Sequence, residues 1–573
     1  MATFNYSVPN EARDVFLNGI INNKRQSGLP QEITTCAKTI KFEGSPLPSI
    51  AINWRFAESM AALKGFEAAM LNVLLGRKYG QSPLEAVINT DHCQLLFMSS
   101  SVLTINPSAH FEVNPTPIRD LSERYKDMFT LQDPFNFASS FHRRASTNIY
   151  RTSDNQFIHI HGSLNPNPTI QALGLPLEDD SVTDRETSYK PYMEVCAKET
   201  AANLESLLDG SARQACTVVK TTEQYKASPH GQANSHVNLY EVHHRPNPAQ
   251  SPGWWPSTPQ TGLQRPLAGL KVLDLTRVIA GPSATRGLAE LGASVMRVTA
   301  KHLPDFTGLQ PDLNWGKWNC FLDLRELSDR EKLKQLILQA DVVVDGYRPG
   351  VFDKYGFGVE GTLRLCADRE RGIIYARENA YGWNGPWKHR SGWQPISDAN
   401  TGISYGFGRA MGNDEPCTPV FPNSDYCTGI AGCVGVMQAL IERAEKGGSY
   451  VVDFSLNYYN HWLAESCGTY PDEVWQDVWT RNGRQKFRHF HSMNVTVPAY
   501  LGMLKENASD TVLQEAFFER RRSKALLGVD FQVVRPAINF PPDTVSLGYN
   551  VGTRANGVDN AYWPDDLTVE MVE

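Results

Sequence analysis

The chain has 573 residues, of which 41% are hydrophobic and 20% are charged, and its formal net charge is -7 at pH 7. This composition is typical of a globular protein with more than one domain, and the negative charge argues against a general nucleic-acid binder. Ten cysteines without a C-x-x-C pair argue against zinc ribbons and a disulfide framework. The chain has no membrane-length apolar run and no signal-peptide pattern, so we expect a cytoplasmic protein that does not bind membranes.

The first part of the chain gives weak signs of a nucleotide-type fold. We expect a helix at 57–77, a strand at 86–89 and another strand at 157–161. No strand–helix–strand unit is visible before residue 50. These patterns predict a partial lobe at 1–245 that includes a smaller α+β part.

The remaining chain alternates between strand and helix patterns. Residues 246–265 are rich in proline, which predicts an extended linker. We then expect a domain at 266–460 and a C-terminal extension at 461–573 that packs on the lobes. The alternation predicts an α/β fold with a doubly wound, mostly parallel, Rossmann-like sheet. The expected strands are 271–276, 294–299, 321–324, 341–344 and 372–376, and the expected helices are 283–291 and 329–338.

A faint repeat relates the two halves of the chain. Gly65 and Gly432 are 367 positions apart, and at the same offset Glu58 corresponds to Asp425. A repeat of this size indicates a partly duplicated domain. Chance alignment of small residues in two amphipathic helices is the alternative.

Four segments carry a resemblance to a known family. They are VLDLTRVIAGPSATRGLAELGASVMRV, ADVVVDGYRPGVFDKYGFG, YGWNGPW with RSGWQPISDANTG, and SDYCTGIAGCVGVMQALIERAEKGGSYVVDFS. In this order they resemble the class III CoA-transferases, of the formyl-CoA transferase and carnitine CoA-transferase type. Because YRTSDNQ and FIHIHG are similar to the hairpin of the family's small lobe, the whole chain resembles its tandem, two-lobed branch.

The resemblance implies that Asp425 is a covalent nucleophile. In the family an aspartate here attacks an acyl-CoA thioester, and the enzyme-bound CoA then passes to an acceptor acid. A carboxylate suits this role, because it is ionised at pH 7 and divides one acyl transfer into easier steps. We expect a helix to begin after Asp425, where backbone N–H groups would keep the carboxylate ionised. The alternative is that Asp425 caps this helix. Glu58 could mark a second site, or it is a helix-surface glutamate.

The resemblance also implies where CoA binds. The adenosine end would lie against Val278, Ile279 and Ala280. A tyrosine face suits adenine stacking, and basic side chains suit phosphates. Lys301 stands beside Ala300, where the family usually has an arginine, and it lacks the two-pronged guanidinium contact. The further implied CoA-contact positions are Gly346, Tyr347, Arg348, Lys354 and Tyr355.

The acceptor segment bears on the reaction type. Racemases that resemble this chain have a histidine in a Gly-His-Asp phrase, where this sequence has Gly392, Trp393 and Gln394. Tryptophan does not exchange protons at neutral pH, so CoA transfer is favoured over racemisation or isomerisation of an acyl-CoA. A catalytically silent binder of CoA esters is a third hypothesis.

The expected ligands and partners follow from this resemblance. They are an acyl-CoA and a small carboxylic acid, without a metal and without a cofactor other than CoA as part of the substrate. His159 and His161 share a strand face, but no third metal ligand has recognisable spacing. The resemblance implies a homodimer or an internally paired monomer.

Overall fold

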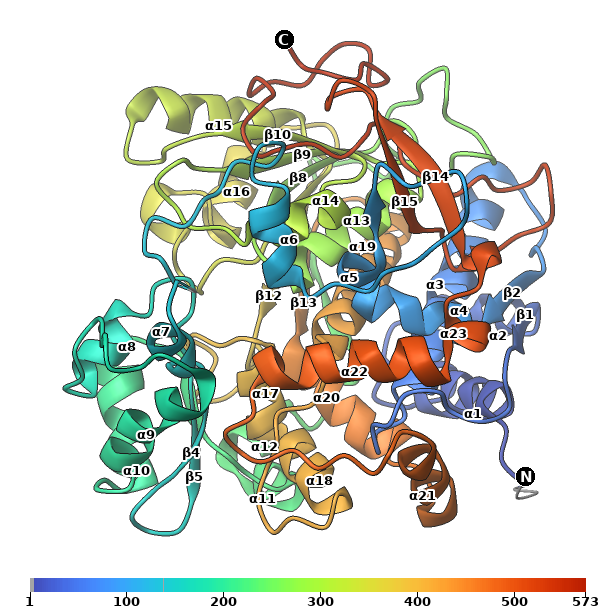
Figure 1. Ribbon diagram of the computed structural model, residues 1–573. Helices are drawn as coiled ribbons and strands as arrows, with labels where there is room; N and C mark the ends of the chain where they lie inside the picture. Colours follow the sequence, from blue (N-terminus) through green and yellow to red (C-terminus); the bar gives the residue numbers. More distant parts are fainter. Residues whose placement is uncertain (1–4, 138) are drawn as a thin grey trace.

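The computed structural model describes residues 5–137 and 139–573, and its centre is a seven-stranded sheet (Figure 1). The strand order is β10-β9-β8-β11-β12-β13-β7, in which the strands from β10 to β13 are parallel and β7 is antiparallel to β13. The parallel strands follow the doubly wound order, in which the chain reverses direction across the sheet between β8 and β11. The strands are β7 (Tyr240–Arg245), β8 (Lys271–Leu275), β9 (Ser294–Thr299), β10 (Lys317–Phe321), β11 (Val342–Asp345), β12 (Ile374–Asn379) and β13 (Ser449–Ser455).

Helices cover both faces of this sheet. Side chains along a strand point alternately to the two faces. On β8, Val272 therefore belongs to the core that includes α13 (Ala280–Glu290) and α19 (Asn423–Lys446). Leu273 belongs to the core that includes α15 (Leu327–Gln339). The expected mixed α/β fold with a large, mostly parallel sheet is confirmed.

The strand predicted at 321–324 is wrong, because β10 ends at Phe321. Its sequence contains Lys317 and Asn319, which obscure the apolar pattern, yet both side chains are fully buried. The Lys317 ammonium is 3.0 Å from the Asp274 carboxylate on β8. The strand was therefore missed because the charge of Lys317 is paired with Asp274, a residue distant in sequence.

A smaller strand–helix–strand unit lies before residue 246. Its parallel strands β1 (Ile40–Glu43) and β2 (Ala86–Asn89) are connected through α3 (Phe56–Tyr79), as β12 and β13 are connected through α19. Helices α3 and α19 have 24 residues each and pack together, and Met60 Sδ lies 4.0 Å from Cys427 Sγ, 367 positions away. The duplication itself stays a prediction.

Contacts cross the predicted linker at 246–265. Strand β7 precedes the linker and pairs with β13, and one hydrophobic core contains residues from both sides of it. Trp255 anchors the linker, because its side chain is buried and its indole donates a hydrogen bond to the Ala268 carbonyl at 2.9 Å.

A separate three-stranded antiparallel sheet forms the small α+β lobe. In Figure 1 this lobe lies at the left, beside the main sheet. Its strands are β4 (Asn148–Arg151), β5 (Phe157–Ile160) and β6 (Cys216–Val218), and its helices are α7 (Phe141–Ala145), α8 (Asn167–Ala172), α9 (Arg185–Cys196) and α10 (Ala201–Glu205).

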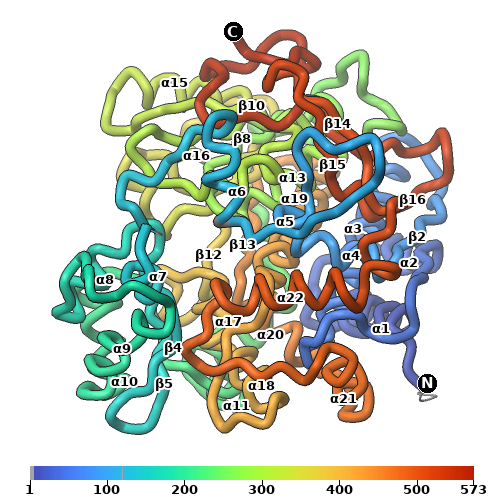
Figure 2. Tube along the Cα trace, in the orientation of Figure 1, coloured from blue at the N-terminus to red at the C-terminus, as the bar shows by residue number. Residues whose placement is uncertain are grey.

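The C-terminal segment is interleaved with the N-terminal one. Helix α22 (Met493–Asn507) crosses the front of the molecule, and the chain then runs beside the N-terminal segments (Figure 2). Strand β15 (Val529–Val534) pairs with β14 (Phe518–Ser523) and β3 (Thr104–Ile105), and β16 (Ile538–Asn539) pairs with β2. Among the described residues, none of the helices combines the length and apolar character needed to cross a bilayer. All ten cysteines are free and buried.

Candidate active site

A polar cavity of about 300 Å³ opens at the carboxyl ends of β8 and β11. In a doubly wound sheet this is the crevice where ligands bind, because the helices that follow these two strands lie on opposite faces. We call this cavity the polar chamber. Of the predicted residues, its lining contains Val278, Ile279, Ala280, Gly346, Tyr347, Arg348, Trp393 and Asp425.

Asp425 reaches the polar chamber from the first turn of α19. The helix begins at Asn423, before Asp425, and its N-cap is Pro422, so the alternative in which Asp425 caps the helix is wrong. Close packing of α19 on α13 is possible because residue 429 is glycine. A Cβ atom there would lie 2.9 Å from the Ala280 carbonyl oxygen. This packing brings the Asp425 carboxylate beside the loop at Val278.

The electrostatic surroundings of Asp425 differ from those expected. Burial, followed by the nearby Glu378 and Asp398 carboxylates, holds the pKa of Asp425 well above its usual range. Burial and Asp345 raise the pKa of Glu378 to about 8. Burial raises the pKa of Asp398 to about 7, although Asn460, Ser424 and Gln394 donate hydrogen bonds to it. Burial and these neighbours thus oppose the expected effect of the helix N–H groups, which would favour the ionised form of Asp425. Sequence reasoning missed these acidic neighbours, which come from separate strands and helices.

Three arginines line the polar chamber. Arg277 lies with its guanidinium carbon 4.8 Å from the centroid of the Tyr347 ring and donates to the Pro304 carbonyl at 2.8 Å. Arg390 is paired with Glu205 and Asp209, and Arg348 extends the positive surface. Sequence reasoning missed Arg277 and Arg390, although Arg277 immediately precedes the predicted loop.

The positive surface continues into an adjoining cavity of about 450 Å³ that contains Arg213, Arg348 and Lys354 in its lining. Two predicted CoA-contact residues, Lys301 and Tyr355, line neither the polar chamber nor this adjoining cavity. Lys301 is exposed beside the Phe321 ring, at 5.9 Å from its centroid. Tyr355 packs on the sheet, with the Arg330 guanidinium 5.2 Å from its ring centroid.

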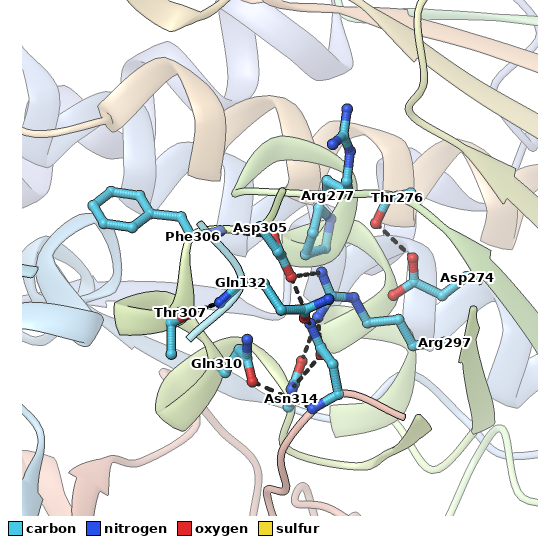
Figure 3. Close-up of polar contacts among 12 residues, drawn as sticks. Gln132, Asp274, Thr276, Arg277, Arg297, Asp305, Phe306, Thr307, Gln310 and Asn314 are labelled. Carbon is cyan, nitrogen blue, oxygen red and sulfur yellow. Dashed lines mark hydrogen bonds and ion pairs between the residues drawn. The ribbon is translucent and has the colours of Figure 1, made fainter. Parts of the chain in front are cut away.

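A buried polar network supports the loop at Val278 (Figure 3). Arg297 on β9 forms an ion pair with Asp305 at 2.9 Å, and both side chains are almost fully buried. Asn556 donates to the same Asp305 oxygen at 2.7 Å and thereby connects the C-terminal segment to the site. At the end of β8, Thr276 donates to Asp274. The network fixes the base of the loop, and the Arg277 side chain extends away from it (Figure 3).

A second cavity, of about 280 Å³, lies on the other side of Asp425. We call it the apolar chamber. Of the predicted residues, it contains Gln394 together with Trp393, Val278, Ile279 and Asp425, which also line the polar chamber. The Trp393 ring stacks on His161 at 5.4 Å, and its indole donates to Ser163 at 3.0 Å. The apolar walls of this chamber are formed by Phe97, Met98, Ile118, Phe137, Phe306, Phe421, Met493 and Val497.

Glu58 does not form part of either chamber. Its side chain is fully buried, and the hydroxyls of Tyr6 and Tyr470 donate hydrogen bonds to it. The Arg55 guanidinium lies 3.7 Å away. Because these partners satisfy the carboxylate, its position gives it a structural role.

Two clusters bear on metal binding. Burial lowers the pKa of His159 to about 4, and the ring of the partly buried His161 stacks beside it, with the ring centroids 6.2 Å apart. Elsewhere in the described chain, Glu241, His243 and Asp453 place possible ligand atoms within 4.8 Å of one another. Arg377 already contacts Asp453 through two nitrogens, at 2.6 and 2.9 Å, so this cluster is an ion-pair network.

Sequence comparisons agree with the geometry. The profile of "CoA-transferase family III" matches residues 267–495. The acetyl-coenzyme A transferase nodX of Hypoxylon pulicicidum is 50% identical over 569 residues, covering 99% of this chain and 95% of that protein. An acyl-CoA transferase of Gibberella moniliformis is 33% identical and covers 71% of each chain. The human succinyl-CoA:glutarate CoA-transferase is 30% identical over 36% of this chain and 48% of that protein.

The chain belongs to CoA-transferase family III, and it is an enzyme of this class.

Proposed function

We propose that this enzyme moves CoA from an acyl-CoA donor to a carboxylic acid through a covalent intermediate on Asp425. The observation that carries the proposal is the position of Asp425, which lines both chambers. The polar chamber offers arginines to an anionic CoA, and the apolar chamber offers space for an acyl group. A carboxylate between them is placed to exchange acyl and thiol groups.

The proposed reaction has four steps. The ionised Asp425 carboxylate attacks the donor thioester carbonyl, the C–S bond breaks, and CoA thiolate leaves an aspartyl–acyl anhydride. The thiolate attacks the aspartyl carbonyl, which releases the donor acid and forms an aspartyl-CoA thioester. The acceptor carboxylate attacks this thioester, which forms a second anhydride and frees the thiolate again. Thiolate attack on the acceptor carbonyl then yields the new acyl-CoA and restores Asp425, so one carboxylate enters and one leaves.

The chamber residues have distinct proposed roles. The Val278 loop and Tyr347 contact CoA, and Arg277, Arg348 and Lys354 attract its phosphates. The amino terminus of α13, at the same loop, favours negative charge. Trp393 and Gln394 contact the acyl group. We propose no metal and no cofactor beyond CoA itself, a cytoplasmic location, and either a homodimer or an internally paired monomer.

The test is CoA exchange between acyl-CoA donors and a panel of acids, followed by mass spectrometry. We expect Asp425→Asn to reduce exchange at least about a thousandfold, because the nucleophile is lost. Glu58→Gln is the matched control, since it makes the same change at the repeat-related position, and it should retain exchange. Hydroxylamine should trap an adduct on Asp425 in the wild type.

Three results would contradict the proposal. Exchange that persists in Asp425→Asn would exclude the covalent role. Deuterium entering the α-position of the acyl group without exchange would identify an isomerase. Tight CoA binding with neither reaction would identify a silent binder.

A further inference from the structure

We infer that the acid that accepts CoA from this enzyme is an apolar monocarboxylic acid, and that its hydrocarbon part occupies the apolar chamber. The inference rests on the proposed function, because it takes Asp425 as the point where the acyl group is attached. It goes beyond that function by naming the substrate class.

The walls of the apolar chamber are aromatic and aliphatic. The rings of Phe97 and Phe421 lie 5.6 Å apart, and the rings of Phe137 and Phe306 meet edge to face, also at 5.6 Å. Val497 on α22 contributes to the same lining. Hydrocarbon placed against such walls leaves water, which favours its binding.

The polar side chains on the lining are mostly engaged with other parts of the protein. Ser100 donates to Asp312 at 2.9 Å, and Trp393 donates to Ser163. The His161 ring accepts a hydrogen bond from the Ser163 backbone at 2.8 Å. The buried Thr418 hydroxyl has no hydrogen-bond partner among the described residues, and it offers a neutral group to a ligand.

A second carboxylate on the acid would find poor compensation here. Arg144 is the one cationic residue among the described residues that line the apolar chamber, and its guanidinium carbon lies 5.4 Å from the Phe141 ring centroid. Burial lowers the pKa of His161 well below its usual value, so that ring is neutral at pH 7. A carboxylate buried without an opposite charge is strongly disfavoured. The contrast with Arg277 and Arg348 of the polar chamber assigns anionic groups to CoA and apolar groups to the acid.

The origin of the walls supports a specificity role. Phe97, Ile118 and Phe137 precede the region that matches the family profile, and Val497 follows it. The matched region thus supplies Asp425, while segments outside it shape much of the apolar chamber.

Phe421 has a φ of 60°, a backbone conformation that is costly for a non-glycine residue and that packing must maintain.

The test compares octanoate with octanedioate, which differ by one terminal carboxylate, and includes 3-phenylpropanoate as an aromatic apolar acid. We expect octanoate to exceed octanedioate at least about tenfold, both in kcat/KM for CoA exchange and in binding measured by calorimetry. Equal or stronger use of octanedioate would refute the inference while leaving CoA transfer intact. Preferential binding of octanoate without CoA exchange would instead refute the proposed function.

Variants of Val497 connect the preference to the chamber. Val497→Lys introduces a cation into the lining. It should lower the ratio of kcat/KM for octanoate to kcat/KM for octanedioate at least about tenfold. Glu506→Gln changes the net charge equally at an exposed position of the same helix, and it should leave the preference unchanged. Val497→Phe keeps the lining apolar but reduces its space, so it should impair octanoate more than acetate. If both Val497 variants retain the wild-type preference, the acid does not occupy this chamber.

Discussion

Replacing Glu378 by glutamine should change how the stability of the protein depends on pH. Burial and the neighbouring Asp345 raise the pKa of Glu378 to about 8, from a usual value near 4.5. The folded protein therefore holds this proton more tightly than the unfolded chain. The resulting stabilisation is complete below about pH 4.5 and is lost as the pH rises towards 8. Glutamine does not titrate, so the variant lacks this loss.

The expected magnitude follows from the shift. Each pKa unit corresponds to about 1.4 kcal/mol, so between pH 5.5 and 8 the wild type should lose about 2–3 kcal/mol relative to Glu378→Gln, allowing for partial solvent screening. An unfolding entropy of about 2 cal/mol/K per residue gives about 1.2 kcal/mol/K for 573 residues. The difference in Tm between variant and wild type should therefore widen by roughly 2 °C over this range.

Differential scanning fluorimetry at several pH values between 5.5 and 8.5 measures this difference. Glu360→Gln, at an exposed position, serves as the control and should show a constant difference. A Tm difference for Glu378→Gln that does not vary with pH would refute the reasoning. It would mean that Glu378 is ionised in the folded protein, and that it repels the Asp425 carboxylate at neutral pH.

Two further changes test the framework of the site. Lys317→Met leaves the buried Asp274 carboxylate unpaired and should destabilise the protein by about 3–5 kcal/mol in denaturant unfolding. Adding Asp274→Asn should recover much of this loss, and a double variant as unstable as the single one would show that the pair is not the cause. Val278 has a φ of 70°, which favours glycine, so Val278→Gly should be more stable than Val278→Ala by about 1 kcal/mol in the same assay. The ordinary order, with alanine more stable, would show that the loop does not adopt this conformation.

The sequence predicted those parts of the fold that depend on local patterns. The predicted strand at 294–299 agrees with β9, and the predicted helix at 283–291 lies largely within α13. Both could be predicted because the spacing of apolar residues along a short segment indicates its secondary structure. The strands of the C-terminal segment were not predicted. Two of them, β15 and β16, pair with β3 and β2, whose residues lie more than 400 positions earlier, and no local sequence pattern indicates this pairing.

The candidate site shows the same division. The local sequence, through its family resemblance, pointed to Asp425 and the loop at Val278, and the structure brings them together because Gly429 permits α19 to pack on α13. Lys301 and Tyr355 were predicted beside them but lie elsewhere: Lys301 is beside the Phe321 ring, and Tyr355 belongs to the short helix Asp353–Tyr355, from which it packs on the sheet.

By itself, the sequence determined the alternation of strands and helices and the chemical identity of the candidate nucleophile. Only the tertiary structure decided that burial and acidic neighbours raise the pKa of Asp425, and that this residue lines both a chamber with arginines and a chamber with aromatic rings. The reason is physical: periodicity is a property of neighbouring residues, whereas electrostatic environment and cavity shape arise from side chains that only folding brings together.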